Sequence, residues 1–572
     1  MSADDAYRVT RAFVDGLAES GVEVVAVGAG SRSTGAVLAF HDDGRFRVFS
    51  FVDERSAAFF ALGAARVMGR PAAVVTTSGT AAANVLPAAV EARVAGVPLL
   101  LLTADRPPEL HDVGAMQTVE QVGLLPASLW SADLHTYDGA MLPAAGHLAA
   151  QACAFAEGSP PGPVHVNVRF REPLISSPDI RMQTMNFPPV VRRDVPVLVP
   201  DEGAVSRIAG RMRAEPRGLI YIGHLDGIHP SLGDAVMRLS GASRYPVIAE
   251  ATSRLRGRLS GAHLVDAGEA LIRAERFAEF HRPGFVLRLG GAPLTRRVAA
   301  WLDQPTAGQV VVSPSLPWPD PARVADEVLA ADPSAACAAL AVAQDGAGTD
   351  VSWAEEWTSA GRRARAALDE RIDLGDDFFE GTVARALVAA LPEDALVYAA
   401  TSLPIRALNS FTSADAPVEA FASRGASGID GTLSLALGGA AAAGRPTACL
   451  TGDLAFLHDL GGLAAAARHR IPLVTVVVDN GGGGIFEFLP HRAGIDRETF
   501  EDLFATVHTF DLAHAAELFG IPFVSVDDAG GLQRALAQAF AEGSAWVIRA
   551  EVDPRASVEA HRAAWAAAAA AL

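Results

Sequence analysis

The sequence is poor in cysteine. Only three occur, Cys153, Cys337 and Cys449, and they are far apart in a chain of 572 residues. They have no metal-ligand spacing and do not form the dense pattern of a disulfide scaffold. We therefore expect a protein of a reducing compartment, without a disulfide framework.

Long hydrophobic runs are also missing. The longest apolar stretches, such as "VPLLLLTA" and "IPLVTVVV", have the length of strands and are too short to cross a bilayer. The N-terminal "MSADDAYRVTRAF" is acidic and amphipathic, which is not the pattern of a signal peptide. These absences predict a cytoplasmic protein with no integral membrane association.

Positive charge is in deficit, because 47 basic residues face 66 acidic ones and the net charge is −19. This balance argues against a nucleic-acid partner bound through a basic surface. An anionic small molecule would have to be held by arginines that are gathered locally.

Short β-branched or leucine-rich runs alternate with alanine-rich helical stretches along the whole chain. This alternation predicts α/β domains in which helices cover both faces of a parallel sheet. Proline-rich and low-information stretches at 187–203 and 341–356 divide the chain into 1–186, 204–345 and 355–572. The C-terminal "HRAAWAAAAAAL" is expected to contribute no chemistry.

Two segments 375 residues apart resemble each other. "ALGAARVMGRPAAVVTTSGT" (61–80) and "ALGGAAAAGRPTACLTGDLA" (436–455) share ALGxAxxxGRP followed by a strand, a threonine and a glycine. Alanine-rich helices also match by chance, so common descent and coincidence both stay open. The resemblance suggests one helix–turn–strand plan in the first and third domains.

The stretch "VEVVAVGAGSRSTG" (22–35) places a strand before a glycine-rich turn. Such a turn can open a dinucleotide site, with a later carboxylate for the ribose. However, Ser33 occupies the position of the third fingerprint glycine. Arg32 in the same turn instead favours a substrate carboxylate or a phosphate.

In the third domain, Asp453 and Asn480 each follow a buried strand and lie 27 residues apart. A strand–helix–strand repeat of this length places both at one edge of a sheet. Their oxygens, with a carbonyl from the glycines at 481–484, suit Mg²⁺. The alternative is two unrelated turn residues.

"GD" followed by "DN" at this spacing resembles the signature of the thiamin-diphosphate enzymes, although Leu454 replaces its usual glycine and Asp479 its first asparagine. The motifs "GSRST", "TADRPPEL", "SRGASGIDGTLS", "GDLAFLHDL" and "DNGGGGIFEFLP" together resemble the 2-succinyl-5-enolpyruvyl-6-hydroxy-3-cyclohexene-1-carboxylate (SEPHCHC) synthases. This resemblance implies three doubly wound parallel-sheet domains: aminopyrimidine-binding, middle and diphosphate-binding. It also implies a homodimer or homotetramer with the cofactor between the first domain of one subunit and the third of another.

The resemblance implies thiamin diphosphate and Mg²⁺ (or Mn²⁺) as cofactors, with 2-oxoglutarate and isochorismate as substrates of menaquinone biosynthesis. Glu54 matches the carboxyl group that exchanges a proton with the aminopyrimidine, a role that burial would support by raising its pKa. On local sequence alone, Glu54 is an exposed partner of Arg55. The residues implied to bind the cofactor are Glu54, Ser402, Ile429, Asp453, Asn480, Gly482, Ile485 and Phe486, with Asp453, Asn480 and Gly482 as metal ligands.

The implied substrate residues are Arg32, Arg106, Gln117, Arg406 and Arg424, since forked guanidinium groups suit substrates that each carry two carboxylates. Met116 in "GAMQ" replaces an asparagine of the family, and Thr401 stands where an asparagine sometimes occurs. Two rival functions remain: another thiamin-dependent 2-oxo acid decarboxylase or carboligase, such as an acetohydroxyacid synthase, and a nucleotide-binding regulatory protein. The first rival would hold fewer carboxylates, and the second would not need Glu54, Asp453 and Asn480 together.

Overall fold

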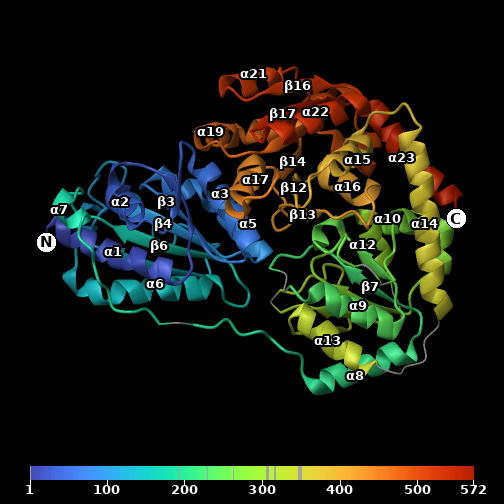
Figure 1. Ribbon diagram of the computed structural model, residues 1–572, viewed down its shortest axis with the longest axis horizontal. Helices are drawn as coiled ribbons and strands as arrows, with labels where there is room; N and C mark the ends of the chain where they lie inside the picture. The colour runs from blue at the N-terminus through green and yellow to red at the C-terminus, as the bar shows by residue number, and fades with distance from the viewer. Residues whose placement is uncertain are drawn as a thin grey trace.

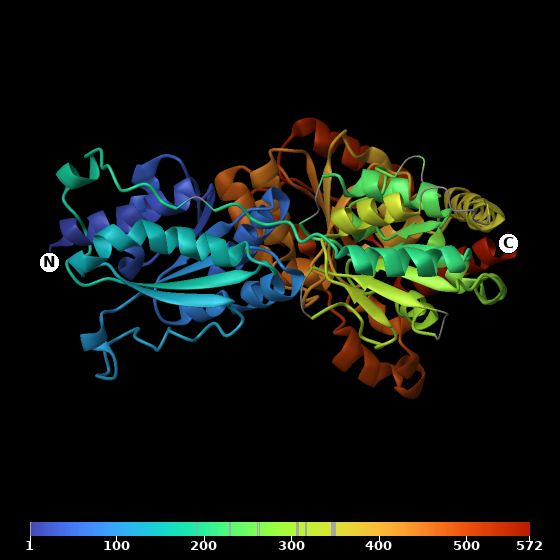
Figure 2. The same cartoon turned by 90° about the horizontal axis from the view of Figure 1, so that it is seen from below.

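The computed structural model describes residues 2–572 except 192, 228–229, 260, 262, 305–307, 315–316 and 345–350. Within these residues the chain forms three parallel sheets with helices on both faces. The predicted α/β class with three doubly wound sheets is therefore confirmed. The first domain lies at one end of the molecule, and the middle and third domains lie together at the other end (Figures 1 and 2).

The first sheet has six strands in the order β2 (Arg47–Phe51), β1 (Val24–Gly28), β3 (Ala72–Thr76), β4 (Leu99–Asp105), β6 (Pro163–Arg169) and β5 (Trp130–His135). One face packs against α1 (Ala3–Glu19), α2 (Thr34–Asp43) and α6 (Leu142–Ala156). The other face packs against α3 (Glu54–Met68) and α5 (Leu86–Ala95). The short helices α4 (Thr80–Asn84) and α7 (Pro178–Arg181) lie in connections.

The middle sheet has the order β11 (Glu327–Leu329), β10 (Gln309–Val312), β9 (Phe285–Leu289), β7 (Gly218–Ile222) and β8 (Val247–Ala249). One face is covered by α8 (Glu202–Ala214), α9 (Leu232–Ser243) and α13 (Pro333–Ala343). The other face packs against α10 (Gly268–Arg273), α11 (Glu275–Phe280) and α12 (Arg296–Leu302). The apolar core on this second face is continuous with a core of the third domain.

The third sheet has the order β13 (Glu419–Phe421), β12 (Leu396–Ala399), β14 (Thr447–Gly452), β15 (Val474–Asp479), β17 (Trp546–Glu551) and β16 (Phe523–Val526). Its outer helices are α14 (Val351–Asp373), α15 (Glu380–Ala390), α16 (Leu403–Phe411), α22 (Ala529–Glu542) and α23 (Pro554–Ala570). Its inner helices are α17 (Thr432–Ala443) and α19 (Leu460–His469), which share one apolar core with α3 and α5. The short helices are α18 (Asp453–His458), α20 (Arg497–Phe500) and α21 (Leu512–Leu518).

The first and third domains share one topology. Strand orders 2-1-3-4-6-5 and 13-12-14-15-17-16 are the same pattern, and the two repeated segments form α3–β3 and α17–β14. The repeated glycines Gly63 and Gly438 lie at the crossing of α3 and α17. A Cβ on Gly63 would overlap the carbonyl of Leu435, and one on Gly438 would overlap that of Phe60. Helix packing therefore explains why both copies carry glycine there.

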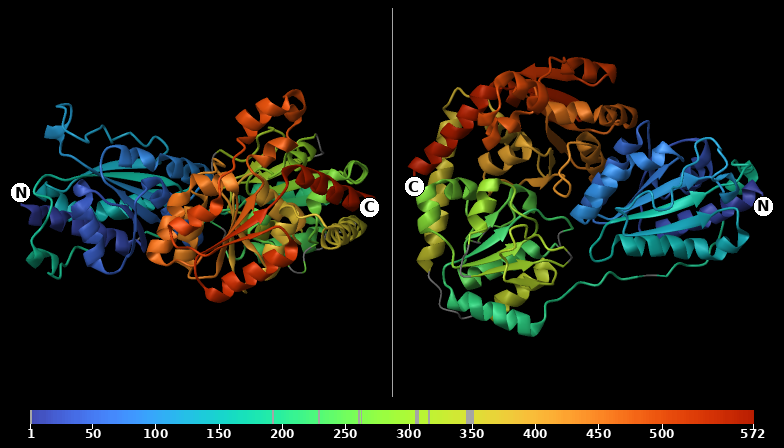
Figure 3. Two further views of the ribbon diagram at one scale, coloured as in Figure 1. Left: turned by 90° about the horizontal axis from the view of Figure 1, so that it is seen from above. Right: turned by 180° about the vertical axis from the view of Figure 1, so that it is seen from behind.

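Two connections were predicted as linkers. The first, in its described residues, is an extended segment without helix or strand between α7 and α8, visible along one edge of the molecule in Figure 3. Residues 345–350 of the second lie outside the described part. Its two ends are helical, because α13 continues to Ala343 and α14 begins at Val351, before the predicted start of the third domain. Among the described residues, no helix has the length and apolarity needed to cross a membrane.

Candidate active site

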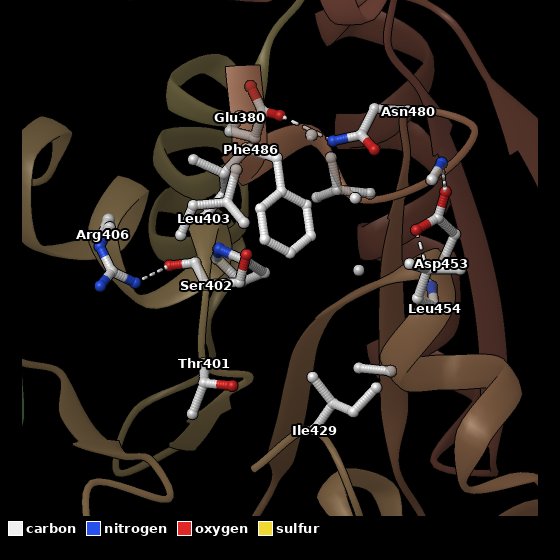
Figure 4. A pocket seen from close by; sticks show the side chains of 18 of the residues that line it. Glu380, Thr401, Ser402, Leu403, Arg406, Ile429, Asp453, Leu454, Asn480 and Phe486 are labelled. Carbon is white, nitrogen blue, oxygen red and sulfur yellow. Dashed lines mark hydrogen bonds between the residues drawn. The ribbon is translucent and has the colours of Figure 1, made fainter. Parts of the chain in front are cut away.

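A cavity of about 360 Å³ opens at the carboxyl edge of the third sheet (Figure 4). Among the described residues, its lining comes entirely from the third domain, in loops that follow β12, β13, β14 and β15 and from the start of α15. Parallel strands end at the same edge, so residues distant in sequence meet there. The predicted residues that line it are Ser402, Arg406, Arg424, Ile429, Asp453, Asn480, Gly482, Ile485 and Phe486.

Asp453 is the first residue of α18 and is 2% exposed. Its Oδ1 accepts the N–H of Leu454 at 2.6 Å, and its Oδ2 accepts the N–H of Gly482 at 2.7 Å. Burial, reinforced by the neighbouring charge of Asp479, raises the pKa of Asp453 well above its usual range. A divalent cation would relieve this repulsion between buried carboxylates.

Asn480 follows β15, which pairs with β14, so the predicted proximity to Asp453 is present. Its Nδ2 donates to Glu380 at 3.3 Å, while its buried Oδ1 has no hydrogen-bond partner among the described residues. Gly482 has φ +150, and a Cβ there would lie 2.4 Å from the Ala505 carbonyl. Its own carbonyl accepts the N–H of Gly484 at 3.0 Å. An orphaned amide oxygen beside a buried carboxylate suits a hard cation.

Two further groups near Asp453 were missed from the sequence. Oxygen and nitrogen ligand atoms of Asp453, Asp479 and His508 lie within 4.8 Å of one another. His508 Nε2 is 3.3 Å from Asp453 Oδ2, and Asp479 accepts the Nε–H of Arg549 at 2.6 Å. Arg549 thus balances the aspartate that replaces the asparagine of the signature, whereas the lone histidine in "TVHTF" gave no sequence signal.

Glu380 is another missed residue. It is 1% exposed at the start of α15, lines the cavity and accepts the Asn480 amide. Ser557 on α23 donates to its other oxygen, and His561 Nδ1 lies 3.8 Å from it. The C-terminal segment was expected to contribute no chemistry, and its His561 contacts the cavity only through Glu380. This contact could not be predicted from the sequence, because only the fold brings α23 to α15.

Two arginines form a like-charged pair in the cavity. Burial, with Arg424 nearby, lowers the pKa of Arg406, and Arg406 donates to the Ser402 carbonyl at 2.5 Å. Ser402 itself has φ +76 and ψ −136, a strained conformation for a residue with a side chain. An anion placed between the two guanidinium groups would offset their mutual repulsion.

The rest of the wall is apolar. Ile429 is 38% exposed, and its side chain points into the open side of the cavity, while Phe486 projects from the opposite loop (Figure 4). Ile485 precedes Phe486 in the same turn. A ligand in this cavity would therefore contact polar groups on one side and the apolar side chains of Ile429, Ile485 and Phe486 on the other.

Three of the other predicted residues meet in the first domain. Arg106 donates to the carbonyl of Gln117 at 2.5 Å, and the Gln117 amide donates to the carbonyl of Ser78 at 2.9 Å. Burial, with the charge of Arg32 nearby, lowers the pKa of Arg106. Arg32 and Arg106 of the first domain are therefore close enough for their like charges to interact, while Arg32 also lies 3.3 Å from Glu172.

The turn at Gly30 closes on itself. The Oγ of Ser33 accepts the Gly30 N–H at 3.1 Å and donates to the Gly30 carbonyl at 3.0 Å. Arg32 is 7% exposed and donates to the Phe170 carbonyl at 3.1 Å, while its Nε has no partner in the described part of the chain. Ser33 thus locks the turn where a dinucleotide site needs a glycine, which disfavours the dinucleotide interpretation.

Glu54 is half-buried at the start of α3, and Asn84 donates to it at 3.4 Å. The Arg55 guanidinium is engaged elsewhere, because it donates to the His458 carbonyl at 2.7 Å and lies 3.8 Å from Asp53. Glu54, Arg32, Arg106 and Gln117 are not among the lining residues of the third-domain cavity. One chain therefore presents two groups of predicted site residues rather than one.

Two family models match the chain. The N-terminal TPP binding domain of thiamine pyrophosphate enzymes matches residues 7–124, and the C-terminal TPP binding domain matches residues 405–550. The matches fall on the first and third sheets, whose edges carry the two residue groups. Fold and site together define a thiamin diphosphate enzyme.

Relatives cover nearly the whole chain. The protein named 2-succinyl-5-enolpyruvyl-6-hydroxy-3-cyclohexene-1-carboxylate synthase in Geobacillus kaustophilus is 38% identical over 563 residues, which are 97% of this chain and 96% of the relative. Proteins of the same name in Myxococcus xanthus and Rubrobacter xylanophilus are 40% and 39% identical, over 98% and 96% of this chain and 97% and 96% of the relatives. The chain belongs to the SEPHCHC synthase family.

Proposed function

We propose that the protein is a SEPHCHC synthase of menaquinone biosynthesis that uses thiamin diphosphate with Mg²⁺ (or Mn²⁺). It decarboxylates 2-oxoglutarate and joins the remaining four-carbon unit to isochorismate by 1,4-addition. One observation carries the proposal: Asp453, Asn480 and Gly482 line the same cavity as Arg406 and Arg424. A metal-bound diphosphate and an anionic substrate would meet there.

The Asp453 carboxylate, the Asn480 Oδ1 and a carbonyl of Gly482 would hold the metal. The buried Asp453 carboxylate supports this assignment, as does the Asn480 amide oxygen, which has no hydrogen-bond partner in the part of the chain that the structure describes. Glu380 would keep the Asn480 oxygen turned toward the metal by accepting from its amide nitrogen. When bound, thiamin diphosphate supplies the carbon nucleophile and takes up the electron pair left by CO₂.

Glu54 would give a proton to the aminopyrimidine ring and take it back, as a general acid–base. Ile429, Ile485 and Phe486 would support the cofactor rings and exclude water from them. The four arginines would divide the substrate carboxylates between two guanidinium pairs, Arg32–Arg106 and Arg406–Arg424. Gln117 would help to orient the first pair.

The complete site would need two copies of the chain. The first-domain residues lie outside the third-domain cavity, and the first domain exposes apolar side chains close in sequence to Glu54 and Gln117. Val52 is 93% exposed and Met116 is 88% exposed. A second subunit would cover them and supply its own cavity, in a homodimer or a homotetramer.

Mixing two inactive variants tests this arrangement. Glu54→Gln and Asp453→Ala proteins, each inactive alone, should regain roughly a quarter of wild-type activity when refolded together, because half of the random dimers are mixed and each has one intact site. Activity is measured after mass spectrometry has verified the mixed dimers. Mixed dimers without activity would place Glu54 and Asp453 of one chain in the same site.

Arg32→Ala should raise the KM for isochorismate by roughly 30- to 150-fold, because a buried charge-assisted contact is worth about 2–3 kcal/mol. Arg32→Lys should recover only part of the loss, since an ammonium group cannot reproduce the fork. Steady-state kinetics and calorimetric cofactor titration measure both variants. Weaker thiamin diphosphate binding with unchanged isochorismate kinetics would make this loop a phosphate site.

Release of CO₂ tests the proposed function against its main rival. The enzyme should release CO₂ from 2-oxoglutarate only with thiamin diphosphate and a divalent metal, and should prefer it to pyruvate. The rival acetohydroxyacid synthase activity would favour pyruvate. No thiamin-dependent CO₂ release from either acid would support the regulatory alternative.

A further inference from the structure

A buried carboxylate of the first domain holds the loop that carries Arg424. The loop 424–428 follows β13, and Arg424 and Ser427 line the cavity. Glu91 on α5 accepts three consecutive N–H groups of this loop: Gly425 at 3.0 Å, Ala426 at 2.7 Å and Ser427 at 3.3 Å. Consecutive N–H groups around one carboxylate form an anion-binding nest.

The contact leaves little freedom to the loop. Glu91 is 2% exposed, and a Cβ on Gly425 would lie 2.9 Å from the Ala95 nitrogen and 2.9 Å from the Glu91 carbonyl. The loop backbone therefore rests directly on α5. A side chain at position 425 would therefore displace the loop, together with Arg424, from α5.

Arg66 connects this contact to all three domains. Its fully buried guanidinium lies 3.2 Å from Glu91 and 3.2 Å from Asp226 of the middle domain. It also donates to the Ala422 carbonyl at the end of β13, at 2.9 Å. Although burial opposes ionisation, Arg66 and His224 lower the pKa of Asp226 to about 2. Asp226 is therefore charged at neutral pH.

Asp226 lies where the middle sheet would receive a ligand. It follows β7, and the order 11-10-9-7-8 changes direction between β7 and β9, the switch point of an open α/β sheet. In this molecule the guanidinium of Arg66 reaches Asp226 from the first domain. The loop after β7 thus contributes to the junction between domains.

We propose that Glu91, Arg66 and Asp226 are positioning residues that set the place of Arg424 and thereby the affinity for the dicarboxylate 2-oxo acid. The inference rests on the proposed function. The sequence offers no sign of it, because Glu91 and Gly425 are 334 residues apart. Asp453 and Asn480, which are proposed to hold the metal, lie on other loops.

Glu91→Gln keeps the side-chain volume but removes the charge and one acceptor oxygen. The KM for 2-oxoglutarate should rise by ~10-fold or more, kcat should fall by less than about 3-fold, and the Kd of thiamin diphosphate with Mg²⁺ should stay within about 2-fold. Asp226 lies 3.2 Å from Arg66 and 2.8 Å from His224. Asp226→Asn should raise the same KM by a smaller factor, ~3-fold. Steady-state kinetics and calorimetry measure these values.

Glu419→Gln is the matched control. Glu419 is a buried carboxylate on β13 that pairs with Arg254 of the middle domain at 2.6 Å and does not line the cavity. The Glu419→Gln variant should have lower thermal stability and an unchanged KM for 2-oxoglutarate. If Glu91→Gln and Asp226→Asn behave in the same way, the junction only holds the domains together. If the wild-type enzyme does not turn over 2-oxoglutarate, the proposed function itself fails.

Discussion

Replacing Asp453 by alanine should abolish activity and weaken the binding of thiamin diphosphate with Mg²⁺ by more than ~100-fold, because the change would remove a carboxylate that is proposed to bind the metal. The expectation rests on the position of the Asp453 carboxylate, which is buried beside Asp479 and His508. It shares its cavity with Asn480, whose amide oxygen has no partner within the described residues. Without the metal, the diphosphate would face a site with no cation to balance it. Calorimetric titration of the variant with cofactor and metal measures the loss directly.

Asp320→Ala provides the control for this variant. Asp320 is also buried, but it lies in the middle domain and pairs with Arg288. Its replacement should destabilise the fold without changing cofactor affinity. Wild-type affinity in Asp453→Ala would refute the metal assignment.

The variant Glu54→Gln should bind the cofactor normally and slow the exchange of its C2 proton by ~10²-fold or more, because an amide keeps the shape but cannot shuttle a proton. NMR detection of C2–H/D exchange in the bound cofactor isolates this step from substrate binding. Asp53→Asn is the neighbouring control. Asp53 caps α3 by accepting the Arg55 N–H, a contact that the asparagine can keep.

Unchanged C2–H/D exchange in Glu54→Gln would mean that Glu54 is a surface residue with no part in proton transfer. The contacts already weaken the pairing with Arg55 suggested by local sequence, since Arg55 is bound to the His458 carbonyl. The half-buried carboxyl group at the start of α3 is instead contacted by Asn84.

Strands in the interior of the sheets could be predicted because both of their faces are buried, which makes their sequences continuously apolar. The strands β1, β3, β4 and β6 of the first sheet are such strands, and each is buried along its whole length. The strands β5 and β16 gave no such signal. Both lie at sheet edges and keep exposed or half-exposed residues.

The third-domain site could be predicted because its residues belong to short motifs at strand ends. All nine predicted residues from this domain line one cavity. Glu380 could not be found in this way, since it contacts Asn480 across 100 residues of chain and lies in no motif. Glu91 could not be found from the sequence either, because it contacts the loop at 425–427 only through the packing of α5 against that loop.

The proposed SEPHCHC synthase activity is tested most directly by the product formed from 2-oxoglutarate and isochorismate, followed by mass spectrometry with and without thiamin diphosphate and Mg²⁺. SEPHCHC and one equivalent of CO₂ should form only when cofactor and metal are both present. Addition of pyruvate in place of 2-oxoglutarate should give little product. Acetolactate from pyruvate, with no adduct from 2-oxoglutarate and isochorismate, would contradict it.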